Sequence, residues 1–317
     1  MPQDPRLLNI SYSSLGTFHE CPRKFQLHRL NVLPVDSSDD PLRSLTFSYG
    51  HLVGNGIQMA LQDIDEDEII WKTFLWWPHA LFEEDTKRKK SFWTGIFAIQ
   101  QFIQVIRPSI LGDWELEFYE GVPAVELSFV ITLPGNFKYR GFVDAVLRNS
   151  KTQEIMVLEV KTTSASISSP AQYQNSAQAV GYSVVLDHID PDLSSYEVLY
   201  LPFNTKDLSY APLPFQKSYL QRALWLQELL LDTQVISLYE ETGVYPMRGE
   251  SCYKFYRDCE YFGLCTLPTS RLTKPLTPEE HEKLLDDLEK YQIKVSFQQL
   301  LETQISKSQE NSDDEIL

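Results

Sequence analysis

Hydrophobic and polar residues alternate along neighbouring stretches in the middle of the chain. Val122 to Leu133 and Tyr139 to Leu147 carry an apolar residue at every second position, which is typical of strands with one buried face. Ile155 to Val160 is more continuously apolar, and this favours a central strand that is buried on both faces. Tyr196 to Leu201 is predicted to be a further strand. The pattern therefore predicts a sheet across the middle of the chain.

Predicted helices flank and interrupt this sheet. They span Phe47 to Gln62, residues 85 to 107, Ala171 to Leu186 and Phe215 to Glu240. The last of them carries an apolar stripe that we place through Leu220, Leu224, Leu229 and Leu230. The mixture of strands and helices predicts an α/β protein.

Length, composition and charge exclude several classes of protein. The 317 residues suffice for one large domain or two small ones, and 43% of them are hydrophobic, so global disorder is not expected. No apolar run approaches the roughly 18–20 residues of a membrane span, and the N-terminus lacks the pattern of a signal peptide. We therefore expect a cytoplasmic protein with no membrane partner. The formal charge of −16 argues against a general nucleic-acid coat, although it leaves room for a local basic groove.

Three ionisable residues in the predicted sheet point to chemistry. Asp144 lies in one strand, and Glu159 and Lys161 lie two residues apart in the next, so the latter two share a face. Two carboxylates suit Mg²⁺ or Mn²⁺, and the carbonyl of Val160 is a candidate third ligand. A lysine beside such a metal can orient and activate a water molecule. This is the chemistry of phosphodiester hydrolysis.

One of the four cysteines lies near the N-terminus, and the other three are clustered near the C-terminus. Four thiolates suit a tetrahedral zinc ion or an iron–sulfur cluster, whereas disulfides are not expected in a reducing cytosol. The late spacing, C-x6-C-x5-C, is looser than that of most zinc knuckles and can wrap a larger cluster. The alternative is that some are ordinary buried cysteines. The positions are Cys21, Cys252, Cys259 and Cys265.

Other polar residues are weaker candidates. The basic run of Lys87, Arg88, Lys89 and Lys90 could contact phosphates, or it could be a solvated helix start. Glu126 points inward on the strand before Asp144 and is either a third carboxylate or half of a cross-strand salt bridge.

The order of these motifs resembles the PD-(D/E)XK nuclease superfamily. Within it, the chain resembles the RecB-like or AddB-type branch with an iron–sulfur cluster, similar to phage-encoded nucleases and CRISPR-adaptation exonucleases. Asp144 matches the G-x-x-D motif, Glu159 and Lys161 match E-x-K, and Gln178 and Tyr182 match Q-x-x-x-Y. The last two are i and i+4 on a helix and therefore share a face.

This resemblance implies a restriction-endonuclease-like mixed sheet flanked by helices, with N- and C-terminal segments joined by a four-cysteine [4Fe–4S] cluster. It divides the chain into an N-terminal helical region (1–110), a nuclease core (111–245), a cysteine loop (246–268) and a C-terminal helix with an acidic tail (269–317). The segment after Leu267 lies outside the motifs, and we expect it to be dispensable for chemistry.

The sequence departs from the family pattern in two places. The usual cysteine triplet is C-x2-C-x5-C, so Cys252 lies farther upstream than expected. The family's metal-ligating histidine aligns with Gly54, and His51 or Gln58 could replace it. The alternative interpretation is that His51 binds no metal and only forms local hydrogen bonds.

The resemblance implies a nuclease that uses Mg²⁺ or Mn²⁺ to cut DNA, as an exonuclease on single strands or duplex ends. It places the protein in recombination, repair or phage DNA processing in the cytoplasm of a bacterium or phage-infected host. A recombination, helicase or annealing protein would be its partner. Two alternatives remain. One is an inactive nuclease-fold adaptor that binds DNA without cutting it, and the other is a structural protein whose cysteines bind zinc.

Overall fold

A computed structural model of the chain describes residues 4–33, 41–78, 81, 89–164, 170–193, 195–254 and 257–314. The chain forms two compact units, and each is discontinuous in sequence. Unit 1 comprises Met1–Ser38, Ser128–Gly141 and Tyr219–Leu317, whereas unit 2 comprises Asp39–Leu127 and Phe142–Ser218.

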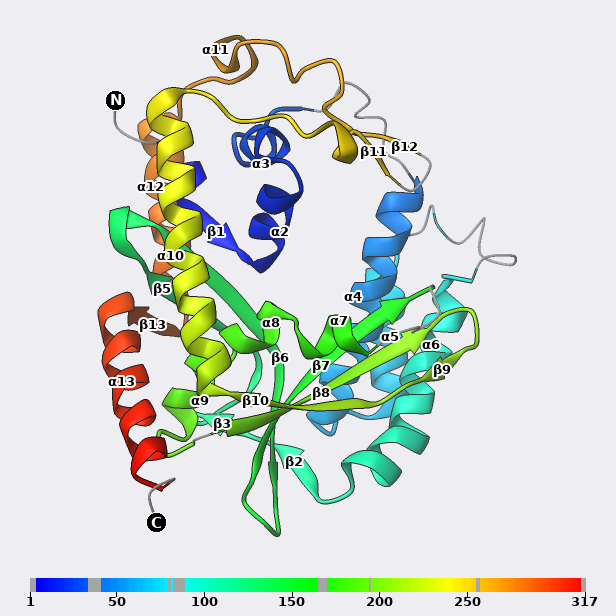
Figure 1. Ribbon diagram of the computed structural model, residues 1–317. Helices are drawn as coiled ribbons and strands as arrows, with labels where there is room; N and C mark the ends of the chain where they lie inside the picture. The colour runs from blue at the N-terminus through cyan, green and yellow to red at the C-terminus, as the bar shows by residue number, and fades with distance from the viewer. Residues whose placement is uncertain are drawn as a thin grey trace. The chain divides into compact units, whose positions relative to one another are not determined.

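Unit 2 contains a mixed sheet (Figure 1). Its strands follow in the order β10 (Leu213–Ser218), β8 (Ser195–Asn204), β7 (Ile155–Thr163) and β6 (Lys138–Asn149), with β9 (Ser209–Tyr210) beside β8 and β2 (Trp114–Leu116) beside β6. Strands β6 and β7 form an antiparallel hairpin, whereas β7 and β8 are parallel. The predicted α/β class with a mixed sheet is therefore confirmed.

Helices cover both faces of this sheet. They are α4 (Pro41–Leu61), α5 (Glu66–Trp76), α6 (Phe92–Gln101) and the π-helix η3 (Phe102–Leu111) on one face, and α7 (Ala171–Gln174), α8 (Ala177–Gly181) and α9 (Ser183–Ile189) on the other. The predicted helix over residues 85 to 107 begins only at Phe92, because Ser91 caps α6 by accepting a hydrogen bond from the Thr94 N–H. Residues 82–88 lie outside the described part of the chain.

Alternation along the strands separates the two faces. The core beneath α4 and α6 contains every second residue of each strand, including Ala145, Leu147, Met156 and Leu158. Because side chains alternate, the residues between them point to the face of α7, α8 and α9. Asp144 and Glu159 belong to this second set.

Unit 1 is built from the ends of the chain and a hairpin. Its main helices are α1 (Pro5–Leu8), α2 (Tyr12–Glu20), α3 (Pro22–Arg29), α10 (Tyr219–Thr242), α11 (Thr269–Leu272), α12 (Pro278–Glu289) and α13 (Phe297–Asp314). Its strands are β1 (Asn9–Ser11), β5 (Val125–Thr132), the first residues of β6, the short pair β11 (Tyr253–Lys254) and β12 (Arg257–Asp258), and β13 (Ile293–Ser296). The chain passes between the units within β5 and again within β6.

The C-terminal segment contributes a strand, β13, to the same sheet beside β5. Strand β13 pairs in parallel with β5, so that Ile293 lies opposite Phe129, and Ile293 is only 1% exposed. The Ser128 N–H and the Gln292 side chain form a further link at 2.9 Å. Part of the C-terminal segment therefore completes a buried surface, and its expected dispensability for chemistry stays a prediction.

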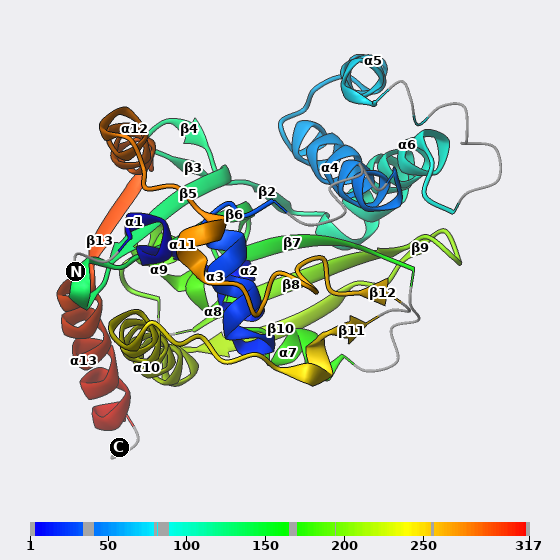
Figure 2. The ribbon, with the colours of Figure 1, turned by 90° about the horizontal axis from the view of Figure 1, so that it is seen from above.

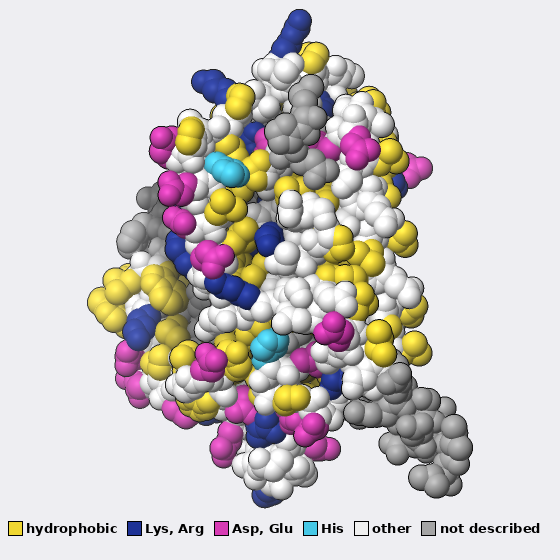
Figure 3. Space-filling view, turned by 90° about the vertical axis from the view of Figure 1, so that its left-hand side faces the viewer, with side chains coloured by type: hydrophobic (Ala, Val, Ile, Leu, Met, Phe, Trp, Pro, Cys, Tyr) yellow, Lys and Arg dark blue, Asp and Glu magenta, His cyan; other side chains and the backbone are white. Residues whose placement is uncertain are grey.

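Helix α10 has two apolar faces instead of the single predicted stripe. Leu226 and Leu229 are buried, whereas Leu220 and Leu224 are exposed. Hydrophobic side chains are also visible at the surface in Figure 3, between charged groups. Isolated exposed apolar residues are normal in folded proteins. None of the helices in the described residues is long and apolar enough to span a membrane.

Candidate active site

Five sequence-predicted residues meet on one face of the unit 2 sheet. Strand β6 carries Asp144, strand β7 carries Glu159 and Lys161, and the α8 region carries Gln178 and Tyr182. The hairpin register pairs Ala145 with Leu158, so Asp144 and Glu159 are the next opposing residues. The period of two then places Lys161 beside Glu159.

The Asp144 carboxylate is held by the backbone of the neighbouring strand. Its Oδ2 accepts a hydrogen bond from the Val160 N–H at 2.9 Å. Burial and, next, the nearby Glu159 carboxylate raise the pKa of Asp144 well above its usual range, while the Lys161 ammonium partly opposes this shift. A divalent cation at this position would relieve the repulsion between the two acids.

The Glu159 carboxylate is almost fully enclosed, with an exposed fraction of 1%. Its Oε2 accepts a hydrogen bond from the Tyr182 hydroxyl, and its Oε1 pairs with the Lys161 ammonium. Tyr182 is itself buried, and its pKa is raised well above the usual value by burial and by the Glu159 charge. Tyr182 thus orients an acid from inside the protein.

The Lys161 side chain connects this buried acid to the surface, since it is 37% exposed. Its Nζ also donates a hydrogen bond to Oε1 of Gln178 at 3.0 Å. The E-x-K and Q-x-x-x-Y motifs are therefore two halves of one hydrogen-bonded group.

The donor set fits a hard divalent cation. Mg²⁺ is commonly bound by one or two carboxylates, with water and substrate oxygens completing its coordination. In the described part of the chain, no group of three or more His, Cys, Asp or Glu side chains is placed to hold a metal ion. Asp144 and Glu159 would therefore need oxygens from the backbone, water or substrate.

Helix α4 carries His51 and Gln58, the two candidates for the place of the family histidine. The His51 side chain is exposed, and its ring lies edge-on to Phe47 with 4.3 Å between centroids. Gln58 is instead buried and donates a hydrogen bond to Oε1 of Glu126 at 2.6 Å. The charge of Glu126 also contributes to the raised pKa of Asp144.

Glu126 stands on an unusual backbone. Its φ of 50° lies in the left-handed region that non-glycine residues rarely adopt. Sequence reasoning raised Glu126 as a third carboxylate but did not connect it with Gln58. The inward position expected for Glu126 is wrong, because its side chain is exposed in β5. Its positive φ and its partner 68 residues away leave no local pattern in the sequence.

The basic run is only partly described. Lys87 and Arg88 lie outside the described residues. Lys89 is exposed, and the Lys90 ammonium donates a hydrogen bond to Thr46 Oγ1 at 3.4 Å. Burial lowers the pKa of Lys90.

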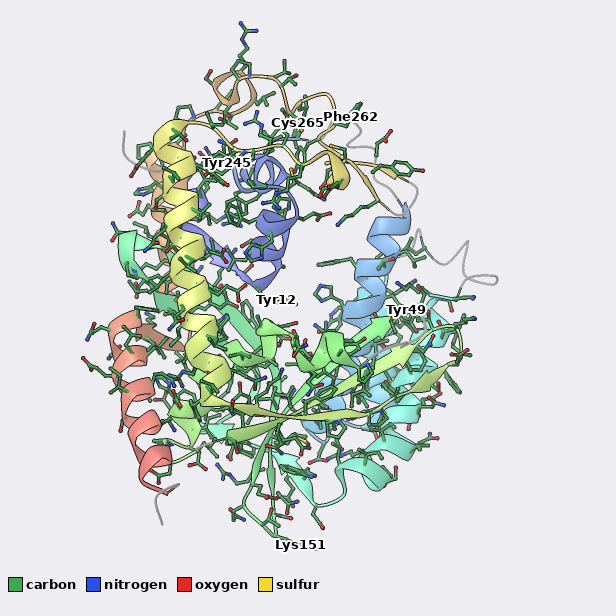
Figure 4. All side chains as sticks on the ribbon, viewed as in Figure 1. Tyr12, Tyr49, Lys151, Tyr245, Phe262 and Cys265 are labelled. Atoms are coloured by element: carbon green, nitrogen blue, oxygen red, sulfur yellow. The ribbon has the colours of Figure 1, made fainter. Side chains whose placement is uncertain are left out.

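The four cysteines belong to unit 1, where they line one cavity of about 250 Å³. Cys21 lies between α2 and α3, and the other three lie on the segment between α10 and α11. Figure 4 places Cys265 and Phe262 together on that segment. Burial, followed by the neighbouring Cys259 and Cys21, raises the pKa of the Cys265 thiol.

The cysteine segment is fastened to the N-terminal helices by groups other than the thiols. The Arg23 guanidinium donates hydrogen bonds to the carbonyls of Cys265 and Leu267, at 3.1 and 2.7 Å, and to Thr269 Oγ1 at 2.8 Å. The Ser251 hydroxyl donates to the Glu20 carbonyl at 2.7 Å.

Comparisons with known proteins identify the family of this chain. A family model described as the PD-(D/E)XK nuclease superfamily matches residues 9–266. The chain belongs to the PD-(D/E)XK nuclease superfamily, whose members are phosphodiesterase nucleases. No curated protein matches it. A solved structure described as "Crystal structure of SSO0001" matches with 12% identity and a TM-score of 0.33, over 82% of this chain and 86% of that one.

Proposed function

We propose that the protein is a metal-dependent DNA nuclease of the RecB-like, iron–sulfur branch. The observation that carries this proposal is the single hydrogen-bonded group formed by Glu159, Lys161, Gln178 and Tyr182 beside Asp144. A structural sheet has no need for two buried acids whose charges repel, because such a pair lowers stability unless a cation offsets it.

Asp144, Glu159 and the carbonyl of Val160 would hold Mg²⁺ or Mn²⁺. The bound metal would supply polarisation of the scissile phosphate and a lower pKa for an attacking water. Lys161 pairs with Glu159 and is partly exposed, so its ammonium can orient that water and offset negative charge on the phosphate. Gln178 positions the Lys161 ammonium, and Tyr182 positions the Glu159 carboxylate.

For the cysteines we propose a [4Fe–4S] cluster held by Cys21, Cys252, Cys259 and Cys265. All four thiols line one cavity, which supports one shared group as their ligand. The loose spacing of the three late cysteines supports a larger group over zinc. Anaerobic purification distinguishes the two, because an iron–sulfur protein is brown with a broad visible absorption, whereas zinc is colourless. Cys21→Ala should lose iron, and full iron content in that variant would contradict the assignment.

We propose DNA as the substrate, with single strands and duplex ends favoured, and a role in recombination, repair or phage DNA processing alongside a helicase or annealing protein in the cytoplasm. The test is digestion of end-labelled single- and double-stranded DNA with Mg²⁺ or Mn²⁺. Lys161→Ala should lower the rate by about 10²-fold or more, the scale of a positioned catalytic group.

Lys151 provides the matched control. It lies at the tip of the β6–β7 hairpin, where Figure 4 labels it, and its ammonium pairs with Asp113. Lys151→Ala should cut DNA at the wild-type rate. If wild-type protein with an intact cluster binds DNA but leaves all substrates uncut in either metal, the protein is an inactive nuclease-fold adaptor.

A further inference from the structure

An exposed aromatic surface covers the outer side of helices α5 and α6. We name it the α5–α6 patch and define it by large apolar side chains that are 37–65% exposed. These are Trp71, Phe74, Leu75, Trp93 and Phe97. Figure 2 shows α5 beside α4 and α6, which separate it from the strands of unit 2. The patch is therefore on the opposite face of the sheet from the carboxylates.

The aromatic rings of the patch are fixed by contacts with one another. Trp71 stacks on Phe74 at 6.0 Å, Phe74 meets the buried ring of Phe92 at 5.9 Å, and Phe92 meets Trp93 at 5.3 Å. This series of rings runs from α5 to α6 without a break. Ordering these side chains on binding therefore costs little further entropy.

The patch is large for an exposed surface. At 150–250 Å² for each aromatic side chain, the exposed fractions amount to about 500 Å² of apolar area. This lies in the range of about 300–600 Å² that marks the largest patch on a typical monomer. With a polar rim it approaches the roughly 800 Å² that each partner contributes to a stable interface.

The two ends of the patch have opposite charge. Helices α5 and α6 are antiparallel, because Gln100 near the end of α6 donates a hydrogen bond to Glu66 at the start of α5, at 2.8 Å. The acidic first turn of α5, with Asp67 and Glu68, therefore lies at one end. Lys89, which precedes α6 and is exposed, lies at the other end.

We propose that the α5–α6 patch is the interface of a two-fold symmetric dimer of this chain. A two-fold axis through the patch turns each copy by 180° relative to the other, so the acidic end of one copy meets the basic end of the other. The aromatic rings then form the apolar centre and the charges form the rim, which is the usual arrangement of a protein interface. The proposal is independent of nuclease activity.

Charge favours a second copy over nucleic acid as the occupant. Proteins that bind single-stranded nucleic acid combine aromatic side chains, on which the bases stack, with a basic groove for the phosphates. Here the first turn of α5 carries Glu66, Asp67 and Glu68, and the neighbouring Lys72 is paired with Glu68 at 2.7 Å. These acids would repel phosphates beside Trp71.

Sedimentation equilibrium of the full chain tests the proposal. Wild-type protein should dimerise, and replacing Trp71 and Trp93 together with alanine should weaken dimerisation at least about tenfold, because buried tryptophans dominate interface energies. Leu220→Ala with Leu224→Ala is the matched control, since these α10 residues are 71% and 60% exposed but lie outside the patch. That control should leave dimerisation unchanged. Thermal unfolding checks that each variant is folded.

Charge exchange tests the antiparallel geometry. Asp67→Lys and Lys89→Asp should each weaken dimerisation, and the two together should restore it, because each copy then meets a complementary end of the other. A wild-type protein that stays monomeric to about 100 μM, above the micromolar Kd of a weak interface of standard size, would overturn the proposal. So would a monomer whose tryptophan fluorescence is quenched by a single-stranded oligonucleotide through Trp93, since the patch would then bind nucleic acid.

Discussion

The hydroxyl of Tyr182 donates a hydrogen bond to one oxygen of the Glu159 carboxylate, while the ammonium of Lys161 pairs with the other oxygen. The orientation of this acid is therefore set by two residues on different elements. Groups that orient a metal-binding side chain in this way affect metal affinity strongly, although they never touch the metal.

Removing the Tyr182 hydroxyl should therefore weaken metal binding. Tyr182→Phe leaves a buried carboxylate oxygen without its donor, and we expect Mn²⁺ affinity to fall by about 10-fold or more, as measured by calorimetry. Tyr196→Phe is the control, because that buried hydroxyl donates to the backbone carbonyls of Ala179 and Val180, at 2.8 and 3.3 Å. Equal Mn²⁺ affinity in both variants would show that Tyr182 only fills space.

Replacing Asp144 should stabilise the metal-free protein. Because the folded-state pKa of Asp144 is raised, its contribution to stability is present below the usual aspartate pKa and is lost as pH rises through the raised value. Asp144→Asn removes this loss of stability. At neutral pH in EDTA, the variant should be more stable than wild type by about 1 kcal/mol, which corresponds to a melting temperature a few degrees higher. Added Mn²⁺ should stabilise wild type but not the variant. An unchanged or lower melting temperature of the variant in EDTA would contradict the expected repulsion.

Strand β13 should be required for stability. Ile293→Ala removes a buried side chain beside β5, and we expect a loss of about 2–4 kcal/mol in urea unfolding. The adjacent Lys294 is exposed and pairs with Glu289, so Lys294→Ala should change stability by less than about 0.5 kcal/mol. If the two variants were equally stable, the C-terminal segment would be an appendage after all.

The contact between α2 and α10 should depend on pH. Nε2 of His19 lies 2.8 Å from Oδ1 of Asp232, and this hydrogen bond is the main cause of the raised His19 pKa. The stability it provides is complete below the usual histidine pKa and disappears as pH rises through the raised value. Unfolding measured between about pH 5 and 9 should therefore show wild type losing stability where Asp232→Asn does not. If stability fell equally with pH in both proteins, the His19–Asp232 pair would not be the cause of the pH dependence.

The sequence predicted the centre of the site because local periodicities determine it. Glu159 and Lys161 are two residues apart on a strand, and Gln178 and Tyr182 are one turn apart on a helix, so each pair shares a face wherever its element lies. Their convergence followed from the family resemblance and from the short hairpin between β6 and β7.

The missed features depend on distant partners. Strand β13 has only four residues, and nothing in Ile293 to Ser296 indicates a partner strand more than 160 residues earlier. The hydrogen bond from Gln58 to Glu126 joins residues far apart in the sequence, and the positive φ of Glu126 is not indicated by its residue type. The outer face of α10 was assigned wrongly because leucines on both sides of a helix fit a single broad stripe.

The anchoring of the cysteine segment by Arg23 has a consequence for how the protein matures. Because the guanidinium binds two carbonyls and a hydroxyl of this segment, the thiols are gathered by bonds that involve no iron. If the cysteines hold the proposed cluster, its assembly would not have to bring the two chain segments together. The protein without iron should then still fold in this part of unit 1.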